Sequence, residues 1–506
     1  MKVFKLFLGF ILGSIFVLSF SPFDFWFLSL FIPFLLYLLI KNENFKNIFF
    51  ISYSFGFGLW VWGIFWIENS ISNYGGTTFF ISSLLTIGLA GFLSLFQAIS
   101  FSFFYPLRSN QTINLFLLFP SIWVISEWAR EFILSGFPWL FIGYTATENI
   151  FFKSYVPLLG SLGVGFLIVL FSCAVGSFVF SLYGKRSKQD LYPIALITLI
   201  LSINFLFIDV DWTKEGKEVD VEIIQPNLSI RDKWGIDGQI KTQDYFKKNI
   251  TENIGIKLDR EKIIFWPEVS FTGVFSEKKF SEIKDILEEE ERLGVVIGTL
   301  TSTEKDEIKN SLVGLGLIEG FYDKKRLVPM GEFIPMENLL GHLFDLFQSS
   351  RPKIISGSGK EILKSKNISI SAAICYEIAY QNTFLEKEGD TNLLLNASND
   401  NWFGQSIGPY QHLQIARFRA AEHQKYLVRV TSTGISALIG PDGKIIQDIS
   451  ISNIDIDQRK FRTIKNKVSL RSGKTPLAKY GKNWFIASIL IIMFLITILK
   501  IRSKWR

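Results

Sequence analysis

The sequence predicts a polytopic bundle of membrane-spanning α-helices joined to an α/β domain outside the membrane. Long apolar runs fill residues 1–210 and one returns at 484–499, whereas residues 215–475 have an ordinary charged composition. The chain is 49% hydrophobic with 51 phenylalanines, more than a soluble domain needs to fill its core. The expected domains are a transmembrane domain of seven spans at 1–212, an extracytoplasmic domain at 213–475, and a last span with a tail at 476–506.

Eight apolar runs are long enough to be counted as spans. A hydrocarbon core about 30 Å thick is crossed by roughly 20 helical residues. Both Pro and Gly interrupt several of these runs, but no long linker separates them. The predicted spans lie near 4–21, 25–40, 48–67, 78–106, 113–133, 155–183, 191–209 and 484–500.

Basic residues predict the orientation of the bundle, because Lys and Arg accumulate in short cytoplasmic loops. They occur at both chain ends and after every second span, whereas the loops at 22–24 and 68–77 contain none. Both termini are therefore expected in the cytoplasm, and the 213–475 domain on the other side of the membrane. Most of the net charge of +7 belongs to these loops, so it gives little support for a nucleic-acid partner. The residues that carry this pattern are Lys2, Lys5, Lys41, Lys46, Arg108, Lys185, Arg186, Lys188, Lys500, Arg502, Lys504 and Arg506.

The 213–475 region alternates short apolar runs with helical patterns, which is typical of an α/β domain. Helices are predicted at 277–292 and 410–424, and Pro-Asp-Gly at 441–443 predicts a hairpin turn. The predicted strand segments are 218–227, 261–268, 293–302, 310–320, 367–377, 392–400 and 426–446.

Three polar residues in or near these strands could act together in one reaction: Glu268, Lys324 and Cys375. Acyl transfer through a thiol needs a base, a nucleophile and a cation near the developing oxyanion. Cys375 has no evident disulfide partner, because the other cysteine, Cys173, lies inside the sixth predicted span. Taken singly, each residue also has a structural interpretation, as a buried strand cysteine, a turn carboxylate and a solvated lysine. The three histidines show no metal-ligand spacing, so neither a metal nor another cofactor is expected.

Longer motifs surround these residues. They are Trp-Pro-Glu ending at Glu268, the run from Tyr322 to Glu332 that reads Y-x-K-x-x-L-V-P-x-G-E, and Cys-Tyr-Glu at 375–377. Together they resemble the nitrilase, or carbon-nitrogen hydrolase, superfamily with its Glu-Lys-Cys triad. With the run from Asn396 to Gly404 and the segment 126–144, the whole chain resembles the apolipoprotein N-acyltransferase family of the bacterial inner membrane. The resemblance implies a nitrilase-like αββα sandwich on the periplasmic side.

The resemblance also implies a reaction and its partners. Cys375 would take an acyl chain from a phospholipid as a thioester, with Glu268 as base and Lys324 at the oxyanion. The acceptor would be the N-terminal amine of a diacylglyceryl-cysteine apolipoprotein, and the bilayer would supply both substrates. Glu332 and Glu377 would fix the lysine and order the site, while Tyr376 and Trp234 would line the entry. Three residues of the segment SGFPWLFIGY would belong either to a lipid-binding surface or to an interfacial aromatic belt: Pro138, Trp139 and Tyr144.

Two alternatives remain open from the sequence. A membrane-tethered amidase or nitrilase would use the same triad but pass the acyl group to water. A transporter or ligand-binding membrane protein would form no covalent adduct at Cys375, and it leaves Glu268 and Lys324 unexplained.

Overall fold

The protein is described here by a computed structural model that covers most of the chain. Its residues fall into two compact units, which are 1–210 with 405–414 and 476–506, and 211–404 with 415–475. Of the positions used above, Lys185, Arg186, Lys188 and Arg506 lie outside the described residues. The described residues are 2–182, 191–254, 257–288, 290–304, 307–329, 331–333, 354–358, 361–385, 391–449 and 461–504.

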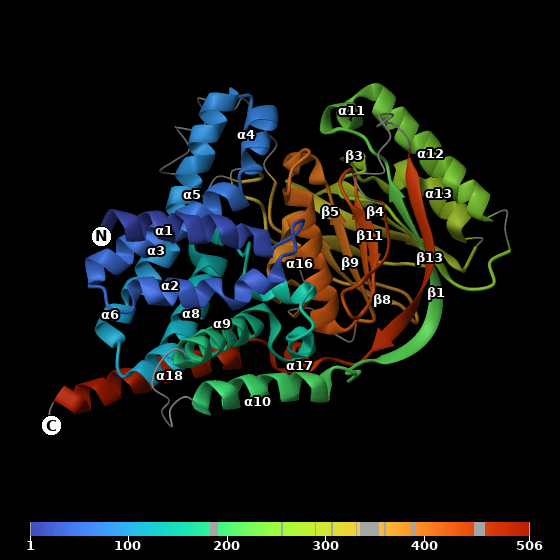
Figure 1. The fold of residues 1–506 in the computed structure, drawn as a ribbon. Helices are drawn as coiled ribbons and strands as arrows, with labels where there is room; N and C mark the ends of the chain where they lie inside the picture. The colour runs from blue at the N-terminus through green and yellow to red at the C-terminus, as the bar shows by residue number, and fades with distance from the viewer. Residues whose placement is uncertain are drawn as a thin grey trace. The chain divides into compact units, whose positions relative to one another are not determined.

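The first unit is helical (Figure 1). Several of its helices begin at a side-chain cap: Asn44 accepts a hydrogen bond from the backbone N–H of Asn47, and Thr78 accepts one from that of Ile81. The α-helices of this unit and its boundary are α1 (Lys2–Phe16), α2 (Ile32–Ile40), α3 (Phe45–Gly63), α4 (Ile67–Gly75), α5 (Phe79–Ser102), α6 (Phe104–Leu107), α7 (Gln111–Ile113), α8 (Phe119–Phe132), α9 (Val156–Leu182), α10 (Leu191–Phe207), α17 (Pro476–Tyr480) and α18 (Asn483–Lys504).

Helices α1 and α3 pack closely through glycine. A Cβ atom on Gly13 would lie 1.9 Å from the carbonyl oxygen of Phe55, and one on Gly58 would lie 2.2 Å from that of Phe10. Small residues at such contacts let two apolar helices approach where the hydrophobic effect drives little association. Gly13 and Gly58 therefore belong to the packing of the bundle.

Four helical segments in the described chain are long and apolar enough to cross a membrane: Phe79–Leu107, Gln111–Ser135, Lys153–Leu182 and Asn483–Arg502. A fifth candidate is the pair α3 and α4, which is bent by 54° at the break between them. The other apolar runs form the shorter helical segments Val3–Ser19, Trp26–Ile40 and Leu191–Phe207. Each predicted span thus corresponds to an apolar helical segment, and the eight-span bundle stays a prediction.

The second unit contains two β-sheets. In the first, the strand order is β13-β1-β2-β4-β5-β6, with β3 paired to β4, and in the second it is β12-β11-β10-β9-β8-β7. Strands β1, β2 and β4 run parallel, as do β8, β9 and β10. The strands are β1 (Lys214–Gln225), β2 (Lys262–Phe265), β3 (Phe271–Val274), β4 (Leu293–Ser302), β5 (Ile308–Gly316), β6 (Phe321–Asp323), β7 (Leu363–Lys364), β8 (Ser369–Ile374), β9 (Leu393–Ser398), β10 (Leu427–Thr431), β11 (Ser436–Ile439), β12 (Ile445–Ile449) and β13 (Arg462–Ser472).

Helices cover the outer faces of the two sheets (Figure 1). Phe246 of α12 (Ile236–Ile254) and Phe280 of α13 (Glu277–Glu288) join one buried cluster with Trp266 and residues of the first sheet. Helix α16 (Gly408–His423) lies by the second sheet, where the guanidinium of Arg417 donates to the carbonyl of Gly443 in the β11–β12 turn, 2.9 Å away. The residues that follow the carboxyl ends of parallel strands are where α/β folds usually place functional side chains.

Most of the predicted elements of this unit are present. The hairpin turn at 441–443 is confirmed, because β11 and β12 on either side of it pair antiparallel. The predicted strand 426–446 is interrupted and forms β10, β11 and the start of β12. Strand β13 was not predicted, although it pairs with β1 from Lys214↔Ser472 to Gln225↔Arg462. Because β13 contains several lysines and arginines, it lacks the clear apolar alternation on which the sequence prediction relied.

Candidate active site

Cys375 follows the last residue of β8 and begins a short 3-10 helix, η8 (Cys375–Ala379). Its backbone φ is +52°, a left-handed conformation that costs energy for a residue with a side chain. Its side chain is only 7% exposed. A sharp turn directly after the buried strand β8 thus places the thiol at the carboxyl end of that strand, in the second sheet.

Glu268 lies just beyond β2 in the first sheet, and its two carboxylate oxygens differ in environment. Oε1 accepts a hydrogen bond from the Asn310 side-chain amide at 2.8 Å and lies 3.3 Å from the Lys324 ammonium. Oε2 is buried and has no hydrogen-bond partner among the described residues. A buried carboxylate oxygen without a donor is costly, and it is available to receive a proton.

Lys324 follows β6 and is almost completely buried. Its ammonium lies between two carboxylates, 2.8 Å from Oε1 of Glu332 and 3.3 Å from Oε1 of Glu268. Burial lowers the pKa of Lys324, but these carboxylates more than offset it and raise that pKa well above the usual value. Lys324 is therefore a cation at physiological pH.

The Cys375 thiol lies within the electrostatic influence of Glu268, Lys324 and Asp400. Burial raises the pKa of Cys375 to about 12; the charge of Glu268 adds to the increase, and that of Lys324 opposes it. The thiol is therefore protonated at rest, and the positive charge of Lys324 alone does not produce a thiolate. Nucleophilic attack from this arrangement needs a base that removes the proton as the sulfur reacts.

Glu377 connects the loop that contains Lys324 to the turn that contains Cys375. One oxygen accepts hydrogen bonds from the backbone N–H groups of Lys325 and Arg326, at 2.8 and 2.9 Å. The other accepts from the backbone N–H of Ile374 at 2.8 Å and from the Tyr322 hydroxyl at 2.9 Å. The buried Glu377 carboxylate therefore links the end of β8, just before Cys375, to the loop that follows Lys324.

The two residues expected at the entry differ in exposure. Trp234, at the end of α11 (Ile230–Trp234), is 50% exposed, whereas Tyr376 is buried and makes an edge-to-face contact with Tyr380 at 5.4 Å. Lys233, next to Trp234, donates to the backbone carbonyl of Glu268 at 3.4 Å. Burial lowers the pKa of Lys233 to about 8, partly opposed by the charge of Glu268.

Pro138, Trp139 and Tyr144 belong to the first unit and are buried within it. The Trp139 indole donates to the side-chain oxygen of Gln411 at 2.7 Å, and the Tyr144 hydroxyl donates to the Pro138 carbonyl at 3.5 Å. Arg130 donates to the carbonyls of Phe137 and Trp139. The segment is therefore a packed loop, and Arg130 of α8 holds it through these hydrogen bonds.

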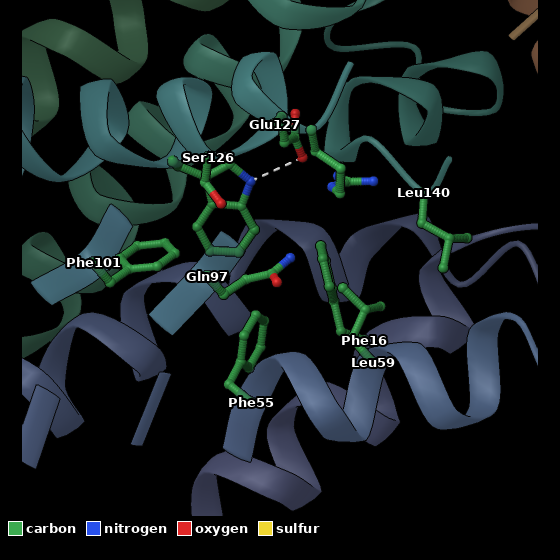
Figure 2. A pocket seen from close by; sticks show the side chains of 10 residues that line it. Phe16, Phe55, Leu59, Gln97, Phe101, Ser126, Glu127 and Leu140 are labelled. Atoms are coloured by element: carbon green, nitrogen blue, oxygen red, sulfur yellow. Dashed lines mark hydrogen bonds between the residues drawn. The ribbon is translucent and has the colours of Figure 1, made fainter. Parts of the chain in front are cut away.

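A small cavity in the first unit lies beside this loop (Figure 2). Figure 2 labels Glu127, Gln97 and Phe55 among the lining residues, and the Trp123 indole donates to Oε1 of Glu127 at 3.1 Å. The cavity has about 10 Å³ of space, roughly enough for one water molecule. Its lining includes none of the triad residues, so it is a feature of the helical bundle.

Three connected buried side chains, two of which act on the Cys375 thiol, had no predicted role. Ser398 and Asp400 end β9 and begin η9 (Asp400–Phe403), and Arg429 lies in β10. The Asn396–Gly404 run contributed to the family resemblance, but no spacing rule indicates that its hydroxyl and carboxylate face the sulfur. Asn310, whose side-chain amide donates to Glu268, likewise had no predicted role.

Comparison with known proteins identifies the family. Residues 12–174 match the apolipoprotein N-acyltransferase N-terminal domain, and residues 256–458 match the carbon-nitrogen hydrolase domain. The apolipoprotein N-acyltransferase of Pasteurella multocida (strain Pm70) is 30% identical, over 98% of this chain and 95% of its own. The chain belongs to the apolipoprotein N-acyltransferase family.

Other apolipoprotein N-acyltransferases match over a similar length. The protein of Coxiella burnetii (strain RSA 493 / Nine Mile phase I) is 30% identical, over 97% of this chain and 99% of its own. That of Wigglesworthia glossinidia brevipalpis is 31% identical, over the same shares. The family resemblance inferred from the motifs is thereby confirmed, and so is the nitrilase-like nature of the domain that contains Glu268, Lys324 and Cys375.

Proposed function

We propose that this protein transfers an acyl chain from a phospholipid to the N-terminal amine of a diacylglyceryl-cysteine apolipoprotein through a thioester on Cys375. Membership of the apolipoprotein N-acyltransferase family supports the reaction class. The observation that carries the assignment to these residues is the buried cluster at the thiol. There Lys324 contacts Glu268 while Oε2 of Glu268 keeps no hydrogen-bond donor among the described residues.

In the first step, Oε2 of Glu268 takes the proton of the Cys375 thiol as the sulfur attacks the ester carbonyl carbon of the phospholipid. The tetrahedral intermediate carries a negative oxygen, which the Lys324 ammonium stabilises together with a backbone N–H near Cys375. When the intermediate collapses, the C–O bond breaks and Glu268 returns its proton to the leaving alkoxide. The products are lysophospholipid and the Cys375 thioester.

In the second step, the neutral α-amine of the apolipoprotein attacks the thioester carbonyl. Glu268 takes the proton that the amine loses, the C–S bond breaks, and this proton returns to the sulfur. The products are an amide and the free thiol. A thioester suits this exchange because it remains reactive toward an amine.

The supporting roles follow from the contacts around the triad. Glu332 holds the Lys324 ammonium at 2.8 Å, and Glu377 holds the backbone of Ile374, just before Cys375, and of Lys325, just after Lys324. The half-exposed Trp234 suits the entry for acyl chains, with Tyr376 deeper in the site. The loop that contains Pro138, Trp139 and Tyr144 assists the approach of lipid, and these packed residues maintain its shape.

The membrane arrangement is part of the same proposal. The protein lies in the bacterial inner membrane with eight spans, both termini in the cytoplasm, and the catalytic domain on the periplasmic side. Both substrates are anchored in a bilayer, which gives a physical reason for joining a carbon-nitrogen hydrolase domain to a helical bundle. The distribution of Lys and Arg and the apolar helices support this topology.

The test is to look for the acyl-enzyme directly. Purified protein is incubated with phospholipid, and the peptide that contains Cys375 is examined by mass spectrometry for an added acyl mass. We expect the adduct in the parent protein and none in Cys375→Ala. Adding a diacylglyceryl peptide should then move the acyl group to its amine. Release of free fatty acid without amide formation would instead identify a hydrolase, and absence of any adduct would contradict both.

A further inference from the structure

A buried polar cluster lies behind the Cys375 thiol and has no part in the reaction described above. It consists of Ser398, Asp400 and Arg429, none of them more than 2% exposed. Strands β8 and β9 pair in parallel with Ile374 opposite Ala397, so the next residues, Cys375 and Ser398, lie side by side at the strand ends. The Ser398 side chain makes a hydrogen bond with the Cys375 side chain.

The same hydroxyl also has a second partner. Ser398 Oγ donates to Oδ1 of Asp400 at 2.8 Å, while Oδ2 of Asp400 accepts from the Arg429 guanidinium at 2.6 Å. Arg429 is itself fixed by a hydrogen bond from Nε to the Ile435 carbonyl at 3.1 Å. Asp400 thus keeps a charged donor even if the hydroxyl turns away from it.

A serine hydroxyl has one hydrogen and two acceptor lone pairs, so it can donate to only one partner at a time. While Cys375 is a thiol, its S–H can donate to Ser398 Oγ, whose own hydrogen then goes to Asp400. A thiolate has no hydrogen to donate and needs donors. The hydroxyl satisfies it by rotating its hydrogen from Asp400 to the sulfur, with no movement of heavy atoms.

We propose that Ser398 is a switching hydrogen-bond partner of the nucleophile, which donates to Asp400 in the resting enzyme and to the Cys375 sulfur as negative charge develops there. This role rests on the proposed function of Cys375 as the nucleophile. Asp400 accepts from the hydroxyl in the resting enzyme. Arg429 donates a hydrogen bond to the Asp400 carboxylate in both positions of the hydroxyl hydrogen.

The charges around the sulfur explain why such a donor is needed. Glu268 and Asp400 both face Cys375 and disfavour a thiolate, and Lys324 is the cation that opposes them. Lys324 is also shared by the carboxylates of Glu268 and Glu332. A neutral donor beside the sulfur lowers the energy of the anion without adding a charge that would weaken Glu268 as a base.

The test measures thiolate formation without lipid, by alkylating the full-length protein with iodoacetamide and quantifying the Cys375 peptide by mass spectrometry. At a pH well below the pKa, the rate is proportional to the thiolate fraction. We expect Ser398→Ala to slow alkylation about tenfold, the usual effect of removing one hydrogen bond to a charged group. The substitution removes an atom and so does not narrow the access of the reagent.

Ser371→Ala is the matched control. Ser371 is also fully buried, in β8 of the same sheet, and its hydroxyl has no hydrogen-bond partner in the described part of the chain. This variant should alkylate at the parent rate. A Ser398→Ala rate equal to or above that of the parent would overturn the proposal, and so would a lower melting temperature with unchanged alkylation. Alkylation does not depend on acyl transfer, so this test can fail while the acyl-enzyme is still found.

Discussion

At the scale of single residues, the site combines a neutral nucleophile with permanent charges. Cys375 is a thiol at rest because burial and the neighbouring carboxylates outweigh the nearby lysine. If Cys375 is the nucleophile, as proposed, its protonated thiol is protected from adventitious chemistry until a substrate carbonyl is in place. This arrangement differs from cysteines whose surroundings lower the thiol pKa.

The pH dependence of thiol reactivity follows from this state. The pKa of Cys375 is raised to about 12, so the thiolate fraction should keep rising about tenfold per pH unit between about pH 7 and about pH 10. Alkylation of Cys375 should rise with the same slope, whereas an unfolded peptide with an ordinary thiol levels off near pH 8.5. A plateau for the folded protein below pH 9 would contradict this prediction.

Replacing the proposed base should remove the reaction while sparing the fold. Glu268→Gln keeps the shape of the side chain and an oxygen for Asn310, but it removes the proton acceptor. We expect the rate of acyl-enzyme formation to fall by about 10²–10⁴-fold, measured by intact mass in a single turnover. The exposed Glu319 offers a matched control, and Glu319→Gln should react like the parent.

At the scale of elements, the site depends on two strand ends that belong to different sheets. Glu268 follows β2 of the first sheet, and Cys375 follows β8 of the second. Glu377 joins the loop after β6 to the end of β8 through bonds to backbone groups. The relative position of the lysine and the thiol is therefore set by main chain, which varies less than side-chain rotamers.

Loss of this link should cost both stability and rate. In Glu377→Gln, one end of the side chain becomes an amide donor that faces backbone N–H groups, so two hydrogen bonds are lost. We expect the free energy of unfolding to fall by about 3 kcal/mol, measured by denaturant titration in detergent. Acyl-enzyme formation should slow even where the variant is fully folded. A fully stable variant with parental rate would show that the link is dispensable.

At the scale of the whole molecule, the proposed topology has a direct test. Glu319→Cys and Asn42→Cys place exposed thiols in the catalytic domain and in the first predicted cytoplasmic loop. A membrane-impermeant maleimide applied to spheroplasts should label Glu319→Cys at once and Asn42→Cys only after the membrane is permeabilised. The parent chain, with its buried Cys173 and Cys375, gives the background. Labelling of Asn42→Cys in intact spheroplasts would reverse the orientation.

The sequence indicated the apolar helices and the α/β domain, and it singled out the proposed triad, because these depend on local patterns and on motifs. It did not reveal β13, which is the last strand of the domain in sequence but pairs with the first strand, β1. Strand β13 also contains few consecutive apolar residues. It also did not reveal Ser398 and Asp400 as neighbours of the sulfur, because that proximity depends on the parallel register of β8 and β9. Pairing between distant segments is what local periodicity does not encode.

The pairing of β1 with β13 has one further consequence. Lys214 and Ser472 are opposite each other, so the first and last strands of this unit lie side by side, although the chain also leaves the unit at 404 and returns at 415. Each of these two strands therefore supplies hydrogen-bond partners to the other, so fraying of one end of the unit's sequence would expose the backbone of the other end.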